Sequence, residues 1–469
     1  MIKKKAYLIG IKGVAMTALA VYLKQSGWQV TGSDTKEIFS TDRVLAELDI
    51  PVKIGFSSQN IKGKFDLIVV TGAHGGMTNP EAIYARKLNF PIYMHGEFLG
   101  KLMQGKIGIS IAGCHGKTTT SSLTASLLMQ AGYDPSYVIG TAGINGLGPA
   151  GHSGRGNFII VEADEYMTCP ETCRIPRFLW QTPKILVITN IEYDHPDAFS
   201  NIREVKNAFI SFTQKVESGG VIIVCVDNNN IREILPQIKR KIVTYGFSSQ
   251  ADYQVEGYYY NAEVSFFRLR YKGVDLGEYL LKIPGKHNIL NAVAASITAN
   301  QIGVSWDKIR QYLKLYTGCK RRFEKIGQYQ DIALYDDYAH HPTEIRATIS
   351  AAADWFTGRR IIVIFQPHTY SRTKTLIKDF AKSFVQADIA IITDIYPSAR
   401  EEFDSTITSS MLVSQANKFK NNAFYQRKLP EVLSFMRQNL KRGDLIITMG
   451  AGDIFLWHNE IIKLIKKEL

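Results

Sequence analysis

Cysteine and proline are both scarce in this chain, which has five cysteines and 15 prolines among 469 residues. An odd and sparse set of cysteines excludes a disulfide-stapled secreted scaffold and fits a reducing compartment, so we expect a cytoplasmic protein. Cys169 and Cys173 form the one close pair, but no second cysteine or histidine pair completes a zinc shell beside them. From the sequence we assign this pair no metal or redox role.

Long hydrophobic runs are also lacking. Residues 1–5 resemble the positive end of a signal peptide, but the apolar run that follows ends at Lys12 and is too short for a signal core. No uninterrupted apolar stretch reaches the roughly 18 residues that would span a bilayer. We therefore expect no membrane partner.

Basic residues exceed acidic ones by 56 to 43, which gives a net charge of +13. Such an excess attracts nucleic acid, a membrane surface or a small polyanion such as a nucleotide. A nucleic-acid surface interleaves basic runs with exposed aromatics, and neither Arg321-Arg322 nor the basic region 463–467 has that pattern. We expect small anionic ligands and no nucleic-acid partner. The oligomeric state stays open.

The length and the strand pattern predict three α/β domains. Single cores seldom grow beyond about 250–300 residues, so this chain favours two or three. Apolar runs at 6–10, 107–112 and 361–365 each lead through glycine or acid into a helical pattern, which is typical of parallel α/β units. Further strands are predicted at 67–70, 158–161, 185–189, 221–226, 389–393 and 445–448. We place the domains at residues 1–105, 106–318 and 319–469.

The strongest local motif is the segment from Gly113 to Thr120, Gly-Cys-His-Gly-Lys-Thr-Thr-Thr. It follows a predicted strand and opens a helical stretch, so its backbone N–H groups and the helix N-terminus favour phosphate. Lys117 is placed to reach the terminal phosphates, and Thr118 to help hold Mg²⁺. Ile111 stands where the general phosphate loop has its first glycine. We nevertheless predict nucleotide binding here.

Acidic residues follow two predicted strands of the central domain. One strand runs into Glu162-Ala-Asp164-Glu165, and the next ends in a segment that carries Asp194 and His195. Carboxylates are the ligands that Mg²⁺ prefers, and an imidazole beside them can complete the shell of a two-metal site. With the phosphate loop, these clusters predict an ATP and Mg²⁺ site.

The first domain begins with a glycine loop that contains Gly10 and Gly13, and Asp34 ends its predicted second strand. This is the layout of a Rossmann-type nucleotide half, with Asp34 placed to meet a ribose. Lys12 and Ala15 stand where a dinucleotide fingerprint needs glycine. We therefore favour a mononucleotide or UDP-sugar site over a nicotinamide site.

Two later segments add further polar side chains. His287 and Asn291 lie one helical turn apart on one face, which indicates either a binding pair or a capped core helix. Arg322 precedes Asp337, His340 and His341 at the start of the third domain. Neighbouring side chains rarely face one ion, so we expect the two histidines to be ligands of substrate rather than a metal pair.

The ordered set of motifs resembles the Mur ligase family of ATP-dependent amide-forming ligases in peptidoglycan synthesis. The similarity covers essentially the whole chain. The motifs that carry it begin at Gly10, Gly116, Glu162, Asn190, His287, Arg322, Asp337, Phe365 and Met449. His95-Gly-Glu97 stands where the family usually has Arg-x-Glu.

The resemblance implies a Rossmann-like UDP-binding domain, a central P-loop ATPase-like domain and a C-terminal Rossmann-like domain. It implies an ATP site made of Gly113, Gly116, Lys117, Thr118, Thr119, His287, Asn291, Arg322 and Asp337. The UDP-sugar side would include Gly10, Gly13, Asp34 and His115. Two Mg²⁺ ions would be held by Thr118, Glu162 and His195. The residues nearest the reaction would be Lys117, His340, His341, His368 and Arg372.

The implied reaction joins L-alanine to the carboxylate of UDP-N-acetylmuramate through an acyl phosphate made with ATP. An alternative amine is the tripeptide L-alanyl-γ-D-glutamyl-meso-diaminopimelate. Two features are more typical of the family member that attaches this tripeptide: the separation of Glu162 and His195 by 33 positions and the Glu165-Tyr166 pair. The third-domain motifs favour alanine. A UDP-sugar sensor or scaffold without ligase activity is the non-enzymatic alternative.

Overall fold

The computed structural model describes residues 3–261, 263–397 and 401–468. Contacts divide the chain into two compact units. The first unit comprises residues 1–259, 266–282 and 288–319, and the second comprises residues 260–265, 283–287 and 320–469. The predicted boundary near 105 lies inside the first unit, and the longest segment of the second unit begins at Lys320, next to the predicted boundary near 319. The three domain ranges stay a prediction.

The first unit begins with a five-stranded parallel sheet of order β3-β2-β1-β4-β5. Its central strands are continuous apolar runs with no exposed residue except Lys5, as expected where helices cover both faces. The strands are β1 (Lys5–Ile9), β2 (Gln29–Asp34), β3 (Val52–Ile54), β4 (Leu67–Val70) and β5 (Ile92–Met94). The helices are α1 (Val14–Gln25), α2 (Asp42–Glu47), α3 (Pro80–Lys87) and α4 (His95–Met103).

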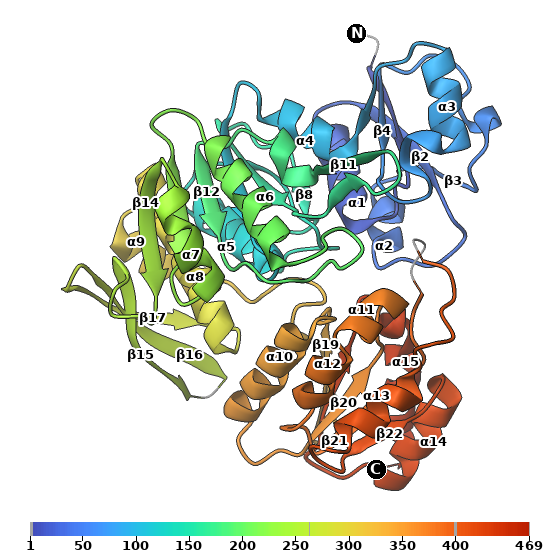
Figure 1. The fold of residues 1–469 in the computed structure, drawn as a ribbon, viewed down its shortest axis with the longest axis vertical. Coiled ribbons are helices and arrows are strands. Elements are labelled where there is room, and N and C mark those ends of the chain that lie inside the picture. Colours follow the sequence, from blue (N-terminus) through green and yellow to red (C-terminus); the bar gives the residue numbers. More distant parts are fainter. Residues whose placement is uncertain (1–2, 262, 398–400, 469) are drawn as a thin grey trace. The chain divides into compact units, whose positions relative to one another are not determined.

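A larger sheet of order β17-β16-β15-β14-β13-β12-β6-β9-β7-β8 follows (Figure 1). Its strands are β6 (Ile107–Ala112), β7 (Ser136–Val138), β8 (Gly151–His152), β9 (Phe158–Ala163), β12 (Ile185–Ile188), β13 (Val221–Cys225), β14 (Lys241–Gly246), β15 (Tyr253–Asn261), β16 (Val264–Tyr271) and β17 (Val274–Leu281). The helices are α5 (Lys117–Gln130), α6 (Ile202–Gln214), α7 (Asn229–Ile234), α8 (Lys286–Ile302) and α9 (Trp306–Leu313). The strands from β7 through β9, β6, β12 and β13 to β14 pair in parallel, so their carboxyl ends share one edge.

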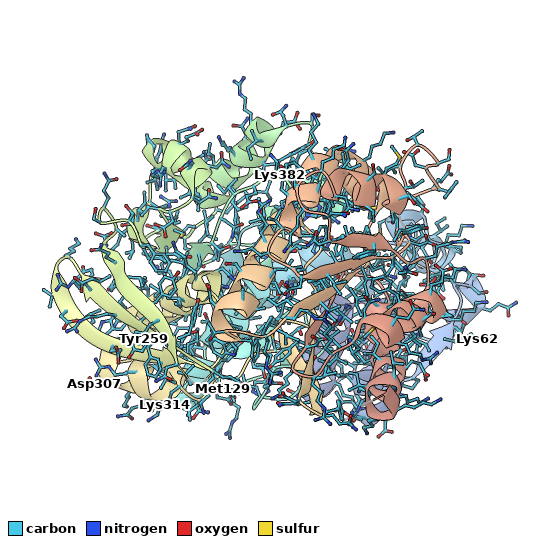
Figure 2. The ribbon with its side chains drawn as sticks, turned by 90° about the horizontal axis from the view of Figure 1, so that it is seen from below. Lys62, Met129, Tyr259, Asp307, Lys314 and Lys382 are labelled. Atoms are coloured by element: carbon cyan, nitrogen blue, oxygen red, sulfur yellow. The ribbon has the colours of Figure 1, made fainter. Side chains whose placement is uncertain are left out.

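Besides β7, β8 and β14, two further features of the central region have no counterpart in the predicted strands. One is the short antiparallel hairpin of β10 (Met167–Cys169) and β11 (Cys173–Pro176). The other is the edge formed by β15, β16 and β17, where Tyr259 stacks on Phe266 with ring centroids 4.9 Å apart. Figure 2 shows Tyr259 on this ribbon. Both features depend on strand pairing, which the apolar pattern alone does not specify.

The second unit is a six-stranded sheet of order β18-β19-β23-β20-β21-β22 with helices on both faces. Its strands are β18 (Glu324–Tyr329), β19 (Ile332–Asp337), β20 (Ile361–Phe365), β21 (Ile389–Ile392), β22 (Ala423–Tyr425) and β23 (Leu445–Met449). Its helices are α10 (Pro342–Trp355), α11 (Tyr370–Thr375), α12 (Ile377–Ser383), α13 (Ser409–Ala416), α14 (Leu429–Asn439) and α15 (His458–Glu468). Residues of α10, α12 and α13 pack in one apolar cluster, and residues of α14 and α15 pack in another.

The α/β fold class is confirmed, and every strand predicted from an apolar run is present with small changes at its ends. The prediction worked because strands buried on both faces are short continuous apolar runs. Within the described ranges, no helix is both long and apolar enough to cross a membrane.

Candidate functional site

The segment predicted to bind phosphate lies between β6 and α5. Gly113 has φ +134° and Gly116 has φ +80°, which are backbone conformations that residues with a Cβ rarely adopt. A Cβ on Gly116 would also overlap the side-chain oxygen of Asn291. The two glycines therefore let the chain turn tightly into the N-terminus of α5, where backbone N–H groups and the helix dipole favour an anion.

Lys117 is held inside this loop by backbone and acidic groups. Its Nζ donates to the Gly113 carbonyl at 2.5 Å and to the Glu165 carboxylate at 2.8 Å. Burial opposes the charge on Lys117, but the carboxylates of Glu165 and Asp164 outweigh it and raise the lysine's pKa. The lysine is thus a fixed cation at the start of α5.

Residues that follow β9 and β12, the two strands on either side of β6, gather beside this lysine. Among the described residues, ligand atoms of Asp164, Glu165 and His195 all lie within 4.8 Å of one another. His195 Nε2 lies 3.4 Å from Glu165 Oε1. Burial raises the pKa of Asp164, but Arg177 at 2.7 Å and Lys117 outweigh that effect and hold the pKa low. Two carboxylates and one imidazole are a donor set that fits Mg²⁺.

Glu162 lies on β9, and the structure does not place it in this three-residue group. Its Oε1 accepts a hydrogen bond of 2.8 Å from the Gly140 N–H. Its assignment as a metal ligand stays a prediction. Glu162 also lines a cavity of about 60 Å³ together with Ala15, His95, Asp164, Arg177 and Gln181. The cavity joins residues of the first sheet's helices to residues of the central sheet.

His95 contributes a buried, neutral ring to that cavity. Burial and, to a smaller extent, the charge of Arg177 lower its pKa to about 4, although a hydrogen bond with the Ala15 backbone opposes both. Its Nε2 is buried and has no hydrogen-bond partner among the residues that the structure describes. A ring that is neutral at physiological pH can accept a hydrogen bond at that nitrogen.

The far side of the phosphate loop is anchored by β12. The Asn190 side chain accepts from the His115 N–H at 2.9 Å and donates to the His115 carbonyl at 2.9 Å. Thr189 also donates to that carbonyl, at 2.6 Å. The His115 ring lies 3.5 Å from Glu192. The motif at Asn190 therefore fixes the loop, and His115 belongs to the loop while its role toward the UDP-sugar stays a prediction.

The first-sheet loop is organised by Asp34. This carboxylate accepts from the Lys12 N–H at 2.7 Å and from the Thr35 N–H at 2.8 Å. Burial raises its pKa, and the two backbone donors oppose that shift. Gly10 has φ +80°, and the Thr71 side chain leaves no room for a Cβ there. Gly13 is the N-cap of α1 and has a negative φ of −57°. Asp34 thus shapes the loop around Gly10, and its contact with a ribose stays a prediction.

The second unit gathers three of the predicted residues at the carboxyl ends of β19 and β20. The His340 and His368 rings lie 6.1 Å apart, and Arg372 lies 3.3 Å from His368 Nδ1. His340 Nδ1 lies 2.9 Å from the Tyr338 carbonyl. These contacts form a polar group with two imidazoles and one fixed cation.

Asp337 ends β19 and is surrounded by neutral donors. It accepts from the Phe323 and Ala339 N–H groups at 3.0 Å and 2.8 Å. Burial raises its pKa to about 6, although Arg322 opposes the shift. Arg322 itself lies over the Tyr338 ring and 3.9 Å from Glu344.

His341 has a structural role that sequence reasoning missed. Its Nδ1 accepts from the Thr343 N–H at 3.3 Å, and the Glu344 carboxylate accepts from the His341 N–H at 3.2 Å, which makes a capping box at the start of α10. The signal was present, since Pro342 and Glu344 are typical of a helix start. The predicted direct role of His341 in the reaction is untested.

The ATP residues predicted outside the phosphate loop are divided between the units. Asn291 lies on α8 in the first unit and accepts from Thr120 at 3.2 Å. His287, Arg322 and Asp337 belong to the second unit. Their joint role stays a prediction. Arg177, which pairs with Asp164, was missed because no local pattern marks it.

Together, the parallel sheets, the phosphate loop and the acidic group define a nucleotide-binding α/β protein with a candidate metal site. Three family models match in order: the Mur ligase family catalytic domain at residues 5–107, the Mur ligase middle domain at 111–299 and the Mur ligase glutamate ligase domain at 321–452. The chain belongs to the Mur ligase family.

Individual relatives agree with that assignment over the full length. The UDP-N-acetylmuramate–L-alanine ligase of Desulfitobacterium hafniense strain Y51 is 41% identical over 450 residues, which are 96% of this chain and 97% of the relative. The crystal structure of a UDP-N-acetylmuramate-alanine ligase from Thermotoga maritima has a TM-score of 0.81 at 26% identity, with 98% of each chain covered. A murein peptide ligase from Psychrobacter arcticus 273-4 shares the fold, with a TM-score of 0.71 at 23% identity and 99% of each chain covered.

Proposed function

We propose that this protein uses ATP to join L-alanine to the carboxylate of UDP-N-acetylmuramate in peptidoglycan synthesis. The observation that carries the proposal is Lys117, fixed at the start of α5 by Glu165 beside the Asp164–Glu165–His195 group. Full-length relatives named as L-alanine ligases support the choice of substrates.

Phosphoryl transfer needs charge compensation, because ATP and the sugar carboxylate are both anions. The loop N–H groups and Lys117 bind the phosphates and stabilise the charge that develops as the γ-phosphoryl moves. The product is an acyl phosphate. The amine of alanine then attacks its carbonyl carbon through a tetrahedral intermediate, and phosphate leaves.

Asp164, Glu165 and His195 would hold Mg²⁺, with Thr118 and Glu162 as further candidates for a second ion. When bound, the metal supplies charge neutralisation and orientation of the phosphate oxygens. Glu165 also holds Lys117 in place, since it forms the 2.8 Å ion pair with that residue. The same carboxylate thus links the lysine to the metal group.

The attacking amine must lose a proton, and an imidazole is suited to accept it near neutral pH. His340 is a candidate because a ring that donates from Nδ1 to the Tyr338 carbonyl carries its lone pair on Nε2. Arg372, beside His368, would stabilise the acyl phosphate. The proposed substrates and ATP place the protein in the cytoplasm.

The test is an incubation of the purified protein with ATP, Mg²⁺ and UDP-N-acetylmuramate, with L-alanine, glycine, L-serine or the tripeptide offered singly. We expect ADP release and a conjugate whose mass shows added alanine. A protein that binds the UDP-sugar without releasing ADP in any arm would be the sensor or scaffold, and the proposal would be wrong.

The tripeptide ligase is the second candidate function. The hairpin β10–β11 lengthens the segment between Glu162 and His195, the feature that the sequence linked with that activity. If a conjugate forms only with the tripeptide, the amine substrate is the tripeptide and not alanine. The reaction class is then unchanged.

A further inference from the structure

The tip of the β10–β11 hairpin places two thiols opposite each other. The strands run antiparallel, and Cys169 is the direct partner of Cys173 across the three-residue turn at 170–172. Both cysteines are free thiols. The proposed ligase chemistry uses neither of them.

Strand pairing brings these two residues within the reach of a covalent bond. Directly opposed residues of an antiparallel pair have Cα atoms about 4.5–5.5 Å apart. A disulfide needs Cα atoms about 4.4–6.8 Å apart, so no backbone movement is required. Both side chains also pack against the same apolar cluster of the first sheet, which includes Tyr7, Phe65 and Met94. The sulfurs therefore lie on the same face of the hairpin.

The two thiols differ in access to solvent. Cys169 is 1% exposed, and its Sγ packs so closely on Gly76 that a Cβ added to this glycine would lie only 2.5 Å from the sulfur. Cys173 is only partly buried at the edge of the same cluster. The partly buried Cys173 thiol can therefore react with a small molecule from solvent. The buried Cys169 thiol can then react with Cys173.

The other cysteines are poor competitors. Cys114, Cys225 and Cys319 are buried. Burial raises the pKa of Cys114 well above its usual value, and burial raises the pKa of Cys225 to about 12. Since the thiolate is the nucleophile, these residues react slowly while the protein is folded.

We propose that Cys169 and Cys173 form a thiol–disulfide exchange site that takes low-molecular-weight disulfides. The Cys173 thiolate attacks one sulfur of the small disulfide, so a mixed disulfide forms and one small thiol leaves. The Cys169 thiolate then attacks Cys173 Sγ, and the second small thiol leaves. The small disulfide is reduced to two thiols, which take up the two protons that the protein loses.

The site lies next to the acidic group of the ligase site along the chain. β10 begins two residues after Glu165, and β11 ends directly before Arg177, which pairs with Asp164. Strand β10 also ties the central region to the first sheet, since the Thr168 carbonyl lies against Gly72. Oxidation therefore crosslinks a segment that both regions share.

The test treats the full-length protein with oxidised glutathione and measures its intact mass without reductant. We expect wild type to lose the mass of two hydrogens and to retain no glutathione. Cys169→Ser should retain one glutathione on Cys173, whereas Cys173→Ser should stay unmodified. A Glu-specific protease cleaves after Glu171, between the cysteines, so the two fragments should remain linked until reductant is added.

The proposal is wrong if wild type retains glutathione, or if both cysteines can still be alkylated after the treatment. A second measurement uses wild type alone and does not depend on the folding of the serine variants. Release of the second glutathione should be at least about tenfold faster in folded protein than in urea, because the hairpin holds the thiols together. Equal rates would exclude a role for the hairpin.

Discussion

The first sheet and the central sheet each carry a glycine loop between a buried strand and a helix, and each loop contains a lysine. In the central loop, Lys117 turns inward and pairs with Glu165 at 2.8 Å. In the first loop, Lys12 is also buried, and its Nζ lies 3.3 Å from Asp42. The same local design therefore holds one lysine beside the candidate metal group and the other against a carboxylate of α2.

The buried carboxyl groups of the two regions also differ in their partners. Glu165 is paired with a lysine, whereas Glu81 of α3 is fully buried among uncharged donors. Glu81 accepts from the Asn60 side chain at 2.6 Å and from the Ser57 N–H at 3.2 Å, and it also bonds the Tyr7 and Ser33 hydroxyls. Glu165 is thus held by a charged partner beside the proposed phosphate site, whereas uncharged donors hold Glu81.

The largest expected effect comes from Lys117→Ala. Loss of one preorganised charge typically reduces turnover by about 100-fold to 1,000-fold, so ADP release should fall at least that far. UDP-sugar binding, measured by calorimetry, should be unchanged. Lys12→Ala is the matched control and should affect UDP-sugar binding more than ADP release. Undiminished turnover of Lys117→Ala would contradict the assigned role.

Glu81→Ala should be the next largest change, and it should affect stability. It leaves several buried donors unsatisfied, at about 1–3 kcal/mol for each, so the free energy of unfolding should fall by about 3 kcal/mol or more. Urea denaturation measures this. Glu81→Gln retains the volume and one carbonyl acceptor and should lose less. Equal losses for the two variants would mean that the hydrogen bonds contribute little.

The neutral His95 predicts a pH dependence of stability. The unfolded imidazole takes up a proton near pH 6.5, whereas the folded one does so near pH 4. The unfolded state therefore binds more protons between these values, and stability is lost as the pH falls through that window. The loss is about 3 kcal/mol, because each pKa unit corresponds to about 1.4 kcal/mol.

His95→Gln should remove that slope, which denaturation curves at neutral pH and near pH 4 would measure. The amide does not titrate, so other groups alone would set the remaining slope. A slope identical to that of wild type would show that His95 does not titrate differently on folding.

Gly116→Ala and Gly13→Ala compare the second glycine of each loop. Gly116 has φ +80° and no room for a Cβ, so alanine should cost about 2 kcal/mol of stability and weaken ATP binding. Gly13 has φ −57° and its nearest neighbour would lie 3.7 Å from the new Cβ. Its substitution should change stability by less than about 0.5 kcal/mol. Thermal unfolding of both variants tests the difference, and similar losses would contradict it.

Sequence patterns located the phosphate loop and both acidic strand ends, because each is a contiguous segment with a strong local requirement. The sequence did not predict which of these residues form the candidate metal site. Glu162 and Glu165 stand three residues apart, and only the paths of β9 and the following turn decide that Glu165 joins His195 while Glu162 bonds the Gly140 N–H. The capping role of His341 could have been found from Pro342 and Glu344.

The sequence by itself determined the α/β class, the buried strands and the glycine turns, since these follow from local hydrophobicity and backbone freedom. Only the tertiary structure decided which distant side chains meet. It paired Arg177 with Asp164, buried His95 against the central region and set Cys169 opposite Cys173. Such contacts depend on strand register and packing between elements, and the free energy of those contacts is not encoded in any single segment.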